Sequence, residues 1–129
     1  MPNPVQGQWS YRSLLNNPDL AVPFDQLRFV QGTLDLAVNG NDITGTIGGP
    51  AWSLDITGTF ESEDQIYFLL HCVGNIGGEV WKYDYRGFVV PDWSDGVDQR
   101  GALVGLIMRV VQHGSAPAGF VASWYGVRQ

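Results

Sequence analysis

Residues 52–60 read WSLDITGTF and alternate strictly between two kinds of side chain. Trp52, Leu54, Ile56 and Phe60 occupy one set of alternate positions, whereas serine, aspartate and threonine occupy the other. Successive side chains of a β-strand point to opposite faces of the sheet. This stretch therefore predicts a strand with one buried face and one solvated face, as in an antiparallel sheet.

The chain before this stretch shows the same alternation on both sides of a turn. Residues 27–38 and 43–47 are two further β-rich runs, and the segment between them begins with Asn39-Gly40. Asn-Gly is the strongest short hairpin signal, because both central residues of a type I′ turn need a positive φ. Residues 27–60 are therefore predicted to form three antiparallel strands.

The rest of the chain repeats short β-rich runs separated by turn residues. No stretch of ten or more residues carries a helical apolar stripe between caps. Most connections are short, so consecutive strands should be antiparallel neighbours. The eight predicted strands are residues 7–12, 27–38, 43–47, 52–60, 66–73, 80–89, 102–111 and 119–127.

An eight-stranded meander leaves two open edges unless the sheet closes on itself. Eight strands close into a barrel that is wide enough for side chains or one small ligand. Residues 1–129 are thus predicted to form a single all-β domain, an antiparallel up-and-down barrel of about eight strands, with a two-sheet β-sandwich as the alternative. Glycines inside predicted strands, which supply the bends of a closed sheet, are Gly32, Gly45, Gly58, Gly87, Gly105 and Gly126.

The charge and cysteine content narrow the range of partners and compartments. The net charge is −6 over 129 residues, and no basic stripe is available to contact phosphates. This argues against binding to nucleic acid or to an anionic membrane. Cys72 is the only cysteine, and the first residues lack the basic and apolar segments of a signal peptide. We therefore expect a cytoplasmic protein.

Three of the predicted strands, residues 66–73, 102–111 and 119–127, are apolar on both faces. The outer face of a barrel wall meets water, and no helix is predicted that would cover these strands. A second copy of the chain is the simplest cover. We therefore predict a homodimer or a larger homo-oligomer that packs partly through these strands.

Aromatic residues dominate the candidate interior. Apolar cavities with a few polar tips bind small apolar molecules, but the same rings can also fill a barrel completely. In the run 81–86, which alternates aromatic and charged residues, inward aromatics are favoured, because burying three charges is costly. The candidate ligand-binding residues are Trp9, Tyr11, Trp52, Tyr83, Tyr85, Arg109 and Trp124.

Arg109 interrupts an otherwise apolar strand and has two interpretations. A buried arginine would need a carboxylate or an anionic ligand, which makes Arg109 the best candidate for binding a ligand carboxylate. The favoured alternative is an arginine near the strand end, whose stem lies along the wall and whose head remains in water.

No group of residues predicts a catalytic, metal or cofactor site. His71 and Cys72 are adjacent in a strand, so they point to opposite faces and cannot act together on one substrate. A zinc site needs three or four ligands at motif spacing, which the sequence does not provide. The aspartates of residues 91–98 depart from the EF-hand pattern and are typical of turns.

Gly7-Gln8-Trp9, the eight-run meander and an aromatic last strand ending in Arg128 resemble the calycins, the lipocalin- and avidin-type barrels. In lipocalins, a Gly-x-Trp motif on the first strand closes one barrel end and a late arginine packs over the tryptophan. The resemblance implies that Trp9 plays the first part and that Arg128, or less favourably Arg109, plays the second. The biotin-binding residues of avidin have no residue-by-residue match.

A second, more local resemblance involves residues 9–13, 81–85 and 96–100. These stretches are similar to a group of uncharacterised bacterial β-barrel proteins, a likeness that implies the fold but no function.

Three functions follow, in order of preference. The first is a barrel that binds a small apolar or amphipathic molecule and self-associates through its outer faces. The second is a filled barrel that acts as an assembly module without a ligand. The third is a calycin-like enzyme acting on a small hydrophobic substrate, which would need an ionisable group inside the barrel.

Overall fold

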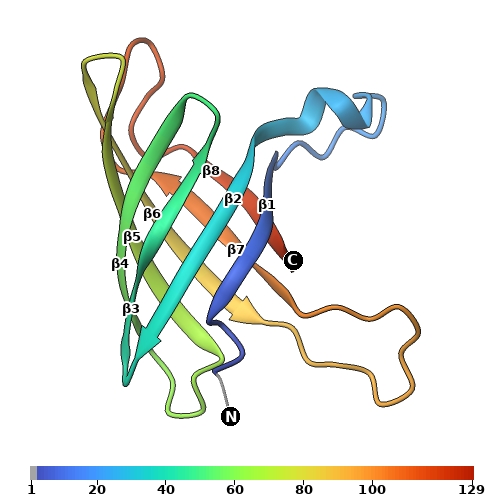
Figure 1. Cartoon of the computed structure of the whole chain (residues 1–129). Helices are drawn as coiled ribbons and strands as arrows, with labels where there is room; N and C mark the ends of the chain where they lie inside the picture. Colours follow the sequence, from blue (N-terminus) through green and yellow to red (C-terminus); the bar gives the residue numbers. More distant parts are fainter. Residues whose placement is uncertain (1–2) are drawn as a thin grey trace.

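The computed structural model describes residues 3–129 and shows a closed barrel of eight antiparallel strands in sequence order (Figure 1). The prediction of an up-and-down barrel is confirmed, and each predicted strand is present with its bounds shifted by no more than three residues. The strands are β1 (Gly7–Leu15), β2 (Arg28–Asn39), β3 (Asp42–Gly49), β4 (Trp52–Phe60), β5 (Tyr67–Ile76), β6 (Glu79–Val89), β7 (Ala102–Arg109) and β8 (Val121–Arg128).

Closure depends on β1, which pairs with β2 on one side and with β8 on the other. Consecutive connections alternate between the two ends of the barrel, as a meander requires. In Figure 1 the segment 16–27, which contains a short 3₁₀ helix (Phe24–Leu27), lies at the upper end, and the loop 90–101 lies at the lower end. Within residues 3–129, no helix is long and apolar enough to cross a membrane.

The lower half of the barrel is filled by aromatic side chains. Tyr11 stacks on Trp124 with ring centroids 5.7 Å apart, and Phe68 lies edge-on to Trp124 at 6.3 Å. Gly87 makes room for these rings, since a Cβ atom at this position would lie 2.3 Å from Phe68 Cζ and 2.9 Å from Trp124 Cζ2. The absence of a side chain at Gly87 thus lets both rings pack directly against the backbone of the strand, so the interior is closely packed here.

Trp9 and Arg128 close the lower end. The Trp9 side chain is buried, and its indole Nε1–H donates to the Val5 carbonyl at 3.0 Å. The Arg128 guanidinium lies 4.3 Å from the centre of the Trp9 ring and donates to the Gln6 carbonyl at 2.7 Å and to the Pro4 carbonyl. The expected contact between Trp9 and Arg128 is confirmed. The barrel is consistent with a calycin-like fold.

Candidate functional site

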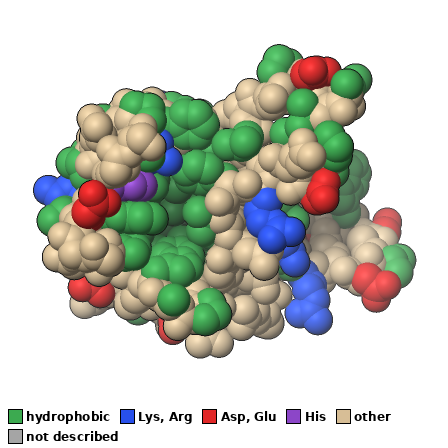
Figure 2. All heavy atoms as spheres, turned by 90° about the horizontal axis from the view of Figure 1, so that it is seen from above, with side chains coloured by type: hydrophobic (Ala, Val, Ile, Leu, Met, Phe, Trp, Pro, Cys, Tyr) green, Lys and Arg blue, Asp and Glu red, His purple; other side chains and the backbone are tan. Residues whose placement is uncertain are grey.

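The upper end of the barrel opens into an apolar pocket of about 320 Å³. Figure 2 looks onto this end and shows hydrophobic side chains gathered around a hollow. A water molecule occupies about 30 Å³ in the liquid, so the pocket is much larger than a packing defect. The interior is therefore filled below and hollow above. The pocket is lined by Phe29, Val30, Ala51, Trp52, Leu54, Ile76, Trp81, Tyr83, Tyr85 and Ile107.

Alternation along β6 supplies one wall of this pocket. Trp81, Tyr83 and Tyr85 point inward, while Lys82 and Arg86 are exposed on the outer face. The favoured orientation of this strand is confirmed. Placing the charges outside avoids the cost of burying them, and the rings remain available to the interior.

Two phenols meet at the floor of the pocket. The Tyr85 hydroxyl lies 3.1 Å from the Tyr11 hydroxyl, and both side chains are buried. Burial raises the pKa of both tyrosines above the ordinary value, so both hydroxyls stay protonated at neutral pH. Their mutual hydrogen bond satisfies both buried hydroxyls beneath the apolar pocket. The filled lower half of the barrel begins at this pair.

Arg109, the last residue of β7, is buried beside the pocket, with only 7% of its surface exposed. The favoured interpretation, in which the head of Arg109 lies in water, is wrong. The segment 110–120 folds back over the strand end, so that Arg109 Nη1 donates to the Pro117 carbonyl at 3.1 Å and Arg109 Nε donates to Tyr83 Oη at 3.4 Å. The position of Arg109 near the end of its predicted strand did not indicate that segment 110–120 would cover it.

Three aromatic rings surround the Arg109 guanidinium. Its Cζ atom lies 5.6 Å from the ring centre of Phe29, 5.9 Å from that of Tyr83 and 5.3 Å from that of Phe120. No carboxylate among residues 3–129 lies within salt-bridge distance of it, since the one contact of that kind found there joins His71 and Asp84. The buried positive charge is thus contacted by π-faces and neutral oxygens alone.

His113 continues this polar cluster. Its Nε2 atom is hydrogen-bonded to Tyr83 Oη at 2.9 Å, and its ring stacks on Trp81 with centroids 4.0 Å apart. Burial, and then the charge of Arg109, lower the pKa of His113. The imidazole is therefore neutral at pH 7 and shares a hydrogen bond with the Tyr83 hydroxyl, whose oxygen also accepts from Arg109 Nε.

The Trp81 indole leaves one donor unused. Its Nε1 atom is buried and has no hydrogen-bond partner among the described residues. Trp81 lines the pocket, but its Nε1 atom has no accessible surface, so this donor lies enclosed in the wall and is not presented to an occupant.

Three of the predicted ligand-binding residues, Trp52, Tyr83 and Tyr85, line the pocket, and Arg109 adjoins it through Phe29 and Tyr83. The structure places the other three in the packed lower half or at its closed end. These are Trp9, Tyr11 and Trp124. Sequence reasoning did not select Phe29, Trp81 or His113, although the alternation of Trp81 with Tyr83 could have identified Trp81.

His71 and Cys72 lie on opposite faces of β5, as predicted. His71 is exposed and its Nδ1 atom is 2.8 Å from Asp84 Oδ1, whereas Cys72 is buried inside the barrel. Burial, and then the nearby Asp84 carboxylate, raise the pKa of the Cys72 thiol, so it is not a reactive thiolate. Within residues 3–129, no three histidine, cysteine, aspartate or glutamate side chains are grouped to hold a metal ion.

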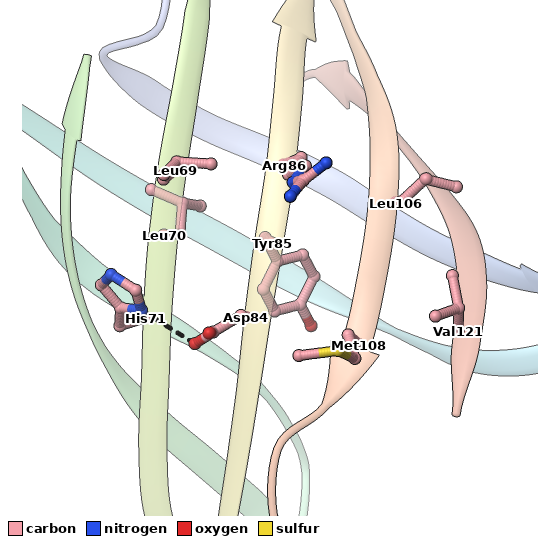
Figure 3. Close-up of a pocket in the computed structure, with 9 residues that line it drawn as sticks. All are labelled: Leu69, Leu70, His71, Asp84, Tyr85, Arg86, Leu106, Met108 and Val121. Atoms are coloured by element: carbon pink, nitrogen blue, oxygen red, sulfur yellow. Dashed lines mark hydrogen bonds and ion pairs between the residues drawn. The ribbon is translucent and has the colours of Figure 1, made fainter. Parts of the chain in front are cut away.

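A second hollow, of about 330 Å³, lies on the outside of the barrel across β5 to β8. Figure 3 shows Leu69 and His71 from β5 beside Asp84 and Arg86 from β6, with Leu106, Met108 and Val121 on the next two strands. We call the outward side chains of β5 to β8 the apolar wall. In register, Leu69 lies beside Arg86 and Leu106, while His71 lies beside Asp84 and Met108.

The opposite side of the barrel has a different exterior. The outward positions of β2, β3 and β4 are almost all polar, and they include Thr33, Asp35, Thr44, Thr46, Ser53, Asp55, Thr57 and Thr59. The apolar wall instead exposes Val73, Phe88, Val104, Leu106, Met108 and Val121, each between 38% and 46% exposed. Among the strands, the exposed large apolar side chains therefore gather on this side, while the loops expose Leu20, Phe24, Trp93 and Val97 more fully.

Comparison with known proteins adds no function to this geometry. No protein-family model matches the chain, and no curated protein matches it in sequence.

Proposed function

We propose that the protein binds a small apolar or amphipathic molecule in the pocket at the upper end of the barrel. One observation carries this proposal, namely an apolar chamber of about 320 Å³ above a floor that is already filled. Ligand pockets are concave and mostly apolar, with a few placed polar groups, and their volumes begin near 300 Å³. The volume therefore favours a small ligand.

A neutral probe tests the pocket without involving charge. We expect 4-phenylbutan-1-ol to bind with one site per chain, as measured by isothermal titration calorimetry, and to change the fluorescence of Trp52 and Trp81. Ala51→Trp places a large ring at the exposed pocket mouth and should abolish binding. Ala37→Trp, the same substitution on the outer face of β2, is the matched control and should bind normally.

The calorimetric result also decides against the second function. If wild-type protein does not bind the probe, or if Ala51→Trp binds as well as wild type, the proposed ligand site is wrong. A folded oligomer without binding would instead support the filled assembly module.

We further infer that two copies associate through the apolar wall. The apolar residues of β5 and β7 flank the charged row of β6, where Lys82, Asp84 and Arg86 alternate in sign. A two-fold axis that lies in the interface, runs perpendicular to β6 and crosses it level with Tyr85 would place Asp84 opposite Arg86 of the second copy. In that arrangement the wall is complementary to itself in charge as well as in hydrophobicity. Contiguous apolar surface of this kind is typical of interaction sites.

Two finer assignments belong with this proposal. The packing of Arg128 over Trp9 supports a calycin-type barrel more specifically than strand number does. The single buried thiol of Cys72 supports a reducing compartment such as the cytoplasm, where proteins rarely carry disulfides.

A further inference from the structure

We propose that the pocket selects ligands with an anionic head, a carboxylate on a small aromatic body, and that Arg109 binds this head. The inference rests on the proposed function, because it assigns the charge and shape of the ligand that the pocket takes. It follows from the charge balance, the free donors and the lining of the pocket.

The charge balance is incomplete without an anion. Arg109 is 93% buried, yet its protein partners are a phenol hydroxyl, a backbone carbonyl and three aromatic rings. Aromatic faces offset part of the desolvation of a cation, but they do not neutralise it. A ligand carboxylate would convert this isolated charge into a charge-assisted pair.

The guanidinium also keeps donors for a ligand. Arginine has five N–H donors, and protein oxygens accept from two of its nitrogen atoms, Nε and Nη1. Nη2 makes no hydrogen bond with the described residues. A ligand carboxylate has two oxygens and can accept from the N–H groups of Nη2 and from the second N–H group of Nη1.

The other charged groups near this position do not compete for Arg109. None of the pocket-lining residues is charged. Glu79 lies close to His113, but its Oε1 atom accepts from the Gly114 amide at 3.2 Å. His113 lies on the other side of Tyr83 from Arg109, and its Nε2 atom is already hydrogen-bonded to the Tyr83 hydroxyl. The net charge of −6 does not favour an anion, so its attraction must come from the local positive charge of Arg109.

The lining predicts how the ligand lies. Arg109 is at the upper end of β7, and Ile107, two residues deeper on the same inward face, lines the pocket with Tyr85. The acidic head therefore sits near the rim and the body points toward the floor. Five aromatic side chains line the chamber, and aromatic pairs are favoured beyond their buried area, which predicts an aromatic body. These side chains are Phe29, Trp52, Trp81, Tyr83 and Tyr85.

Three probes with the same body and different heads test the inference. They are 4-phenylbutanoate, 4-phenylbutan-1-ol and 4-phenylbutylamine, titrated by calorimetry at pH 7.5 in low salt. We expect wild-type protein to bind the acid at least about tenfold more tightly than the alcohol, since hydrogen bonds to charged groups are stronger than neutral ones. The amine should bind more weakly than the alcohol, because its charge repels Arg109.

Substitution of Arg109 tests whether this residue causes the preference for the acid over the alcohol. Arg109→Met removes the charge and keeps an unbranched apolar chain, so the acid and the alcohol should bind equally. Arg12→Met removes an exposed charge on β1 and is the matched control, for which the preference should remain. Arg109→Lys keeps the charge but loses the planar fork, so it should retain a smaller preference.

The outcomes separate the two proposals. Equal binding of acid and alcohol by wild-type protein overturns the anionic head while leaving the pocket intact, and so does an acid preference that survives in Arg109→Met. Failure of all three probes to bind overturns the proposed function together with this inference. If Arg109→Met does not fold, the comparison of the three probes on wild-type protein decides the charge preference, and Arg109→Lys decides its source.

Discussion

Substitution of Leu106 on the apolar wall should weaken self-association by a predictable amount. Leu106 is 44% exposed, and full burial of a leucine contributes about 1.5–3 kcal/mol. Burial of the remaining surface at an interface would contribute roughly 0.7–1.3 kcal/mol per copy. A two-fold interface contains each residue twice, so Leu106→Ser should cost about 1.3–2.6 kcal/mol, a rise of roughly 10- to 80-fold in the dimer Kd.

Sedimentation velocity over a concentration series measures this shift directly. The barrel itself should be unaffected, because Leu106 points outward, and the free energy of unfolding of the monomer in urea should change by no more than about 0.5 kcal/mol. Thr57→Ser, an outward substitution on β4, is the matched control and should dimerise like wild type. A wild-type chain that stays monomeric at micromolar concentration refutes the reasoning, and so does a Leu106→Ser protein that dimerises with unchanged affinity.

Three further predictions concern stability. Gly87→Ala places a Cβ atom against Phe68 and Trp124 and should destabilise the fold by about 1–3 kcal/mol in urea denaturation followed by tryptophan fluorescence. Gly126→Ala is the matched control and should cost less, because its Cβ would make only ordinary contacts, the nearest at 3.5 Å from Trp9 Cβ. Arg128→Met loses its charge-assisted bond to the Gln6 carbonyl and its contact with Trp9, so the same measurement should show a loss of about 1–2 kcal/mol, and an unchanged midpoint would contradict the closing role of Arg128. The folded state holds His113 with a lowered pKa, so the unfolded chain binds more protons as the pH falls below about 6.5, and wild type should lose stability in this window relative to His113→Gln, whereas parallel pH profiles would exclude the effect.

The fold was predictable because its signals are local. The alternation of residues 52–60 and the Asn39-Gly40 turn each specify strand geometry within a few residues, and repetition of such signals implies the meander. The contact of Trp9 with Arg128 joins residues at opposite ends of the chain. It was predictable only through the resemblance to calycins, since no local pattern pairs the two residues.

The candidate site was less predictable because its environment is assembled from distant segments. Arg109 is covered by Pro117 and Phe120 from the following loop and by Phe29 from β2, on the other side of the barrel opening. Strand alternation shows which side chains point inward, but it does not show whether their summed volume fills the space. That volume depends on register, which places Phe68 beside Gly87 and Trp124 beside Gly105.

Register therefore explains why the barrel is both filled and hollow. Phe68, Gly87, Gly105 and Trp124 form one continuous row across β5 to β8, and the two glycines give their space to the two rings. The row two residues nearer the upper end holds Leu70, Tyr85 and Ile107 on β5 to β7. No glycine stands in this part of the row for a neighbouring ring to fill, and Tyr85 and Ile107 line the pocket.

The strand β7 separates the two proposed activities on alternate residues. Ile107 and Arg109 face the interior, while Leu106 and Met108 face the outer hollow. Because adjacent side chains of a strand point to opposite faces, single substitutions should divide the activities. Leu106→Ser should weaken association and leave the affinity for 4-phenylbutanoate unchanged, and Arg109→Met should do the reverse. If either substitution changed both the dimer affinity and the ligand affinity, occupation of the pocket would have to alter the outer face of β7. Ligand binding and association would then be coupled in both directions.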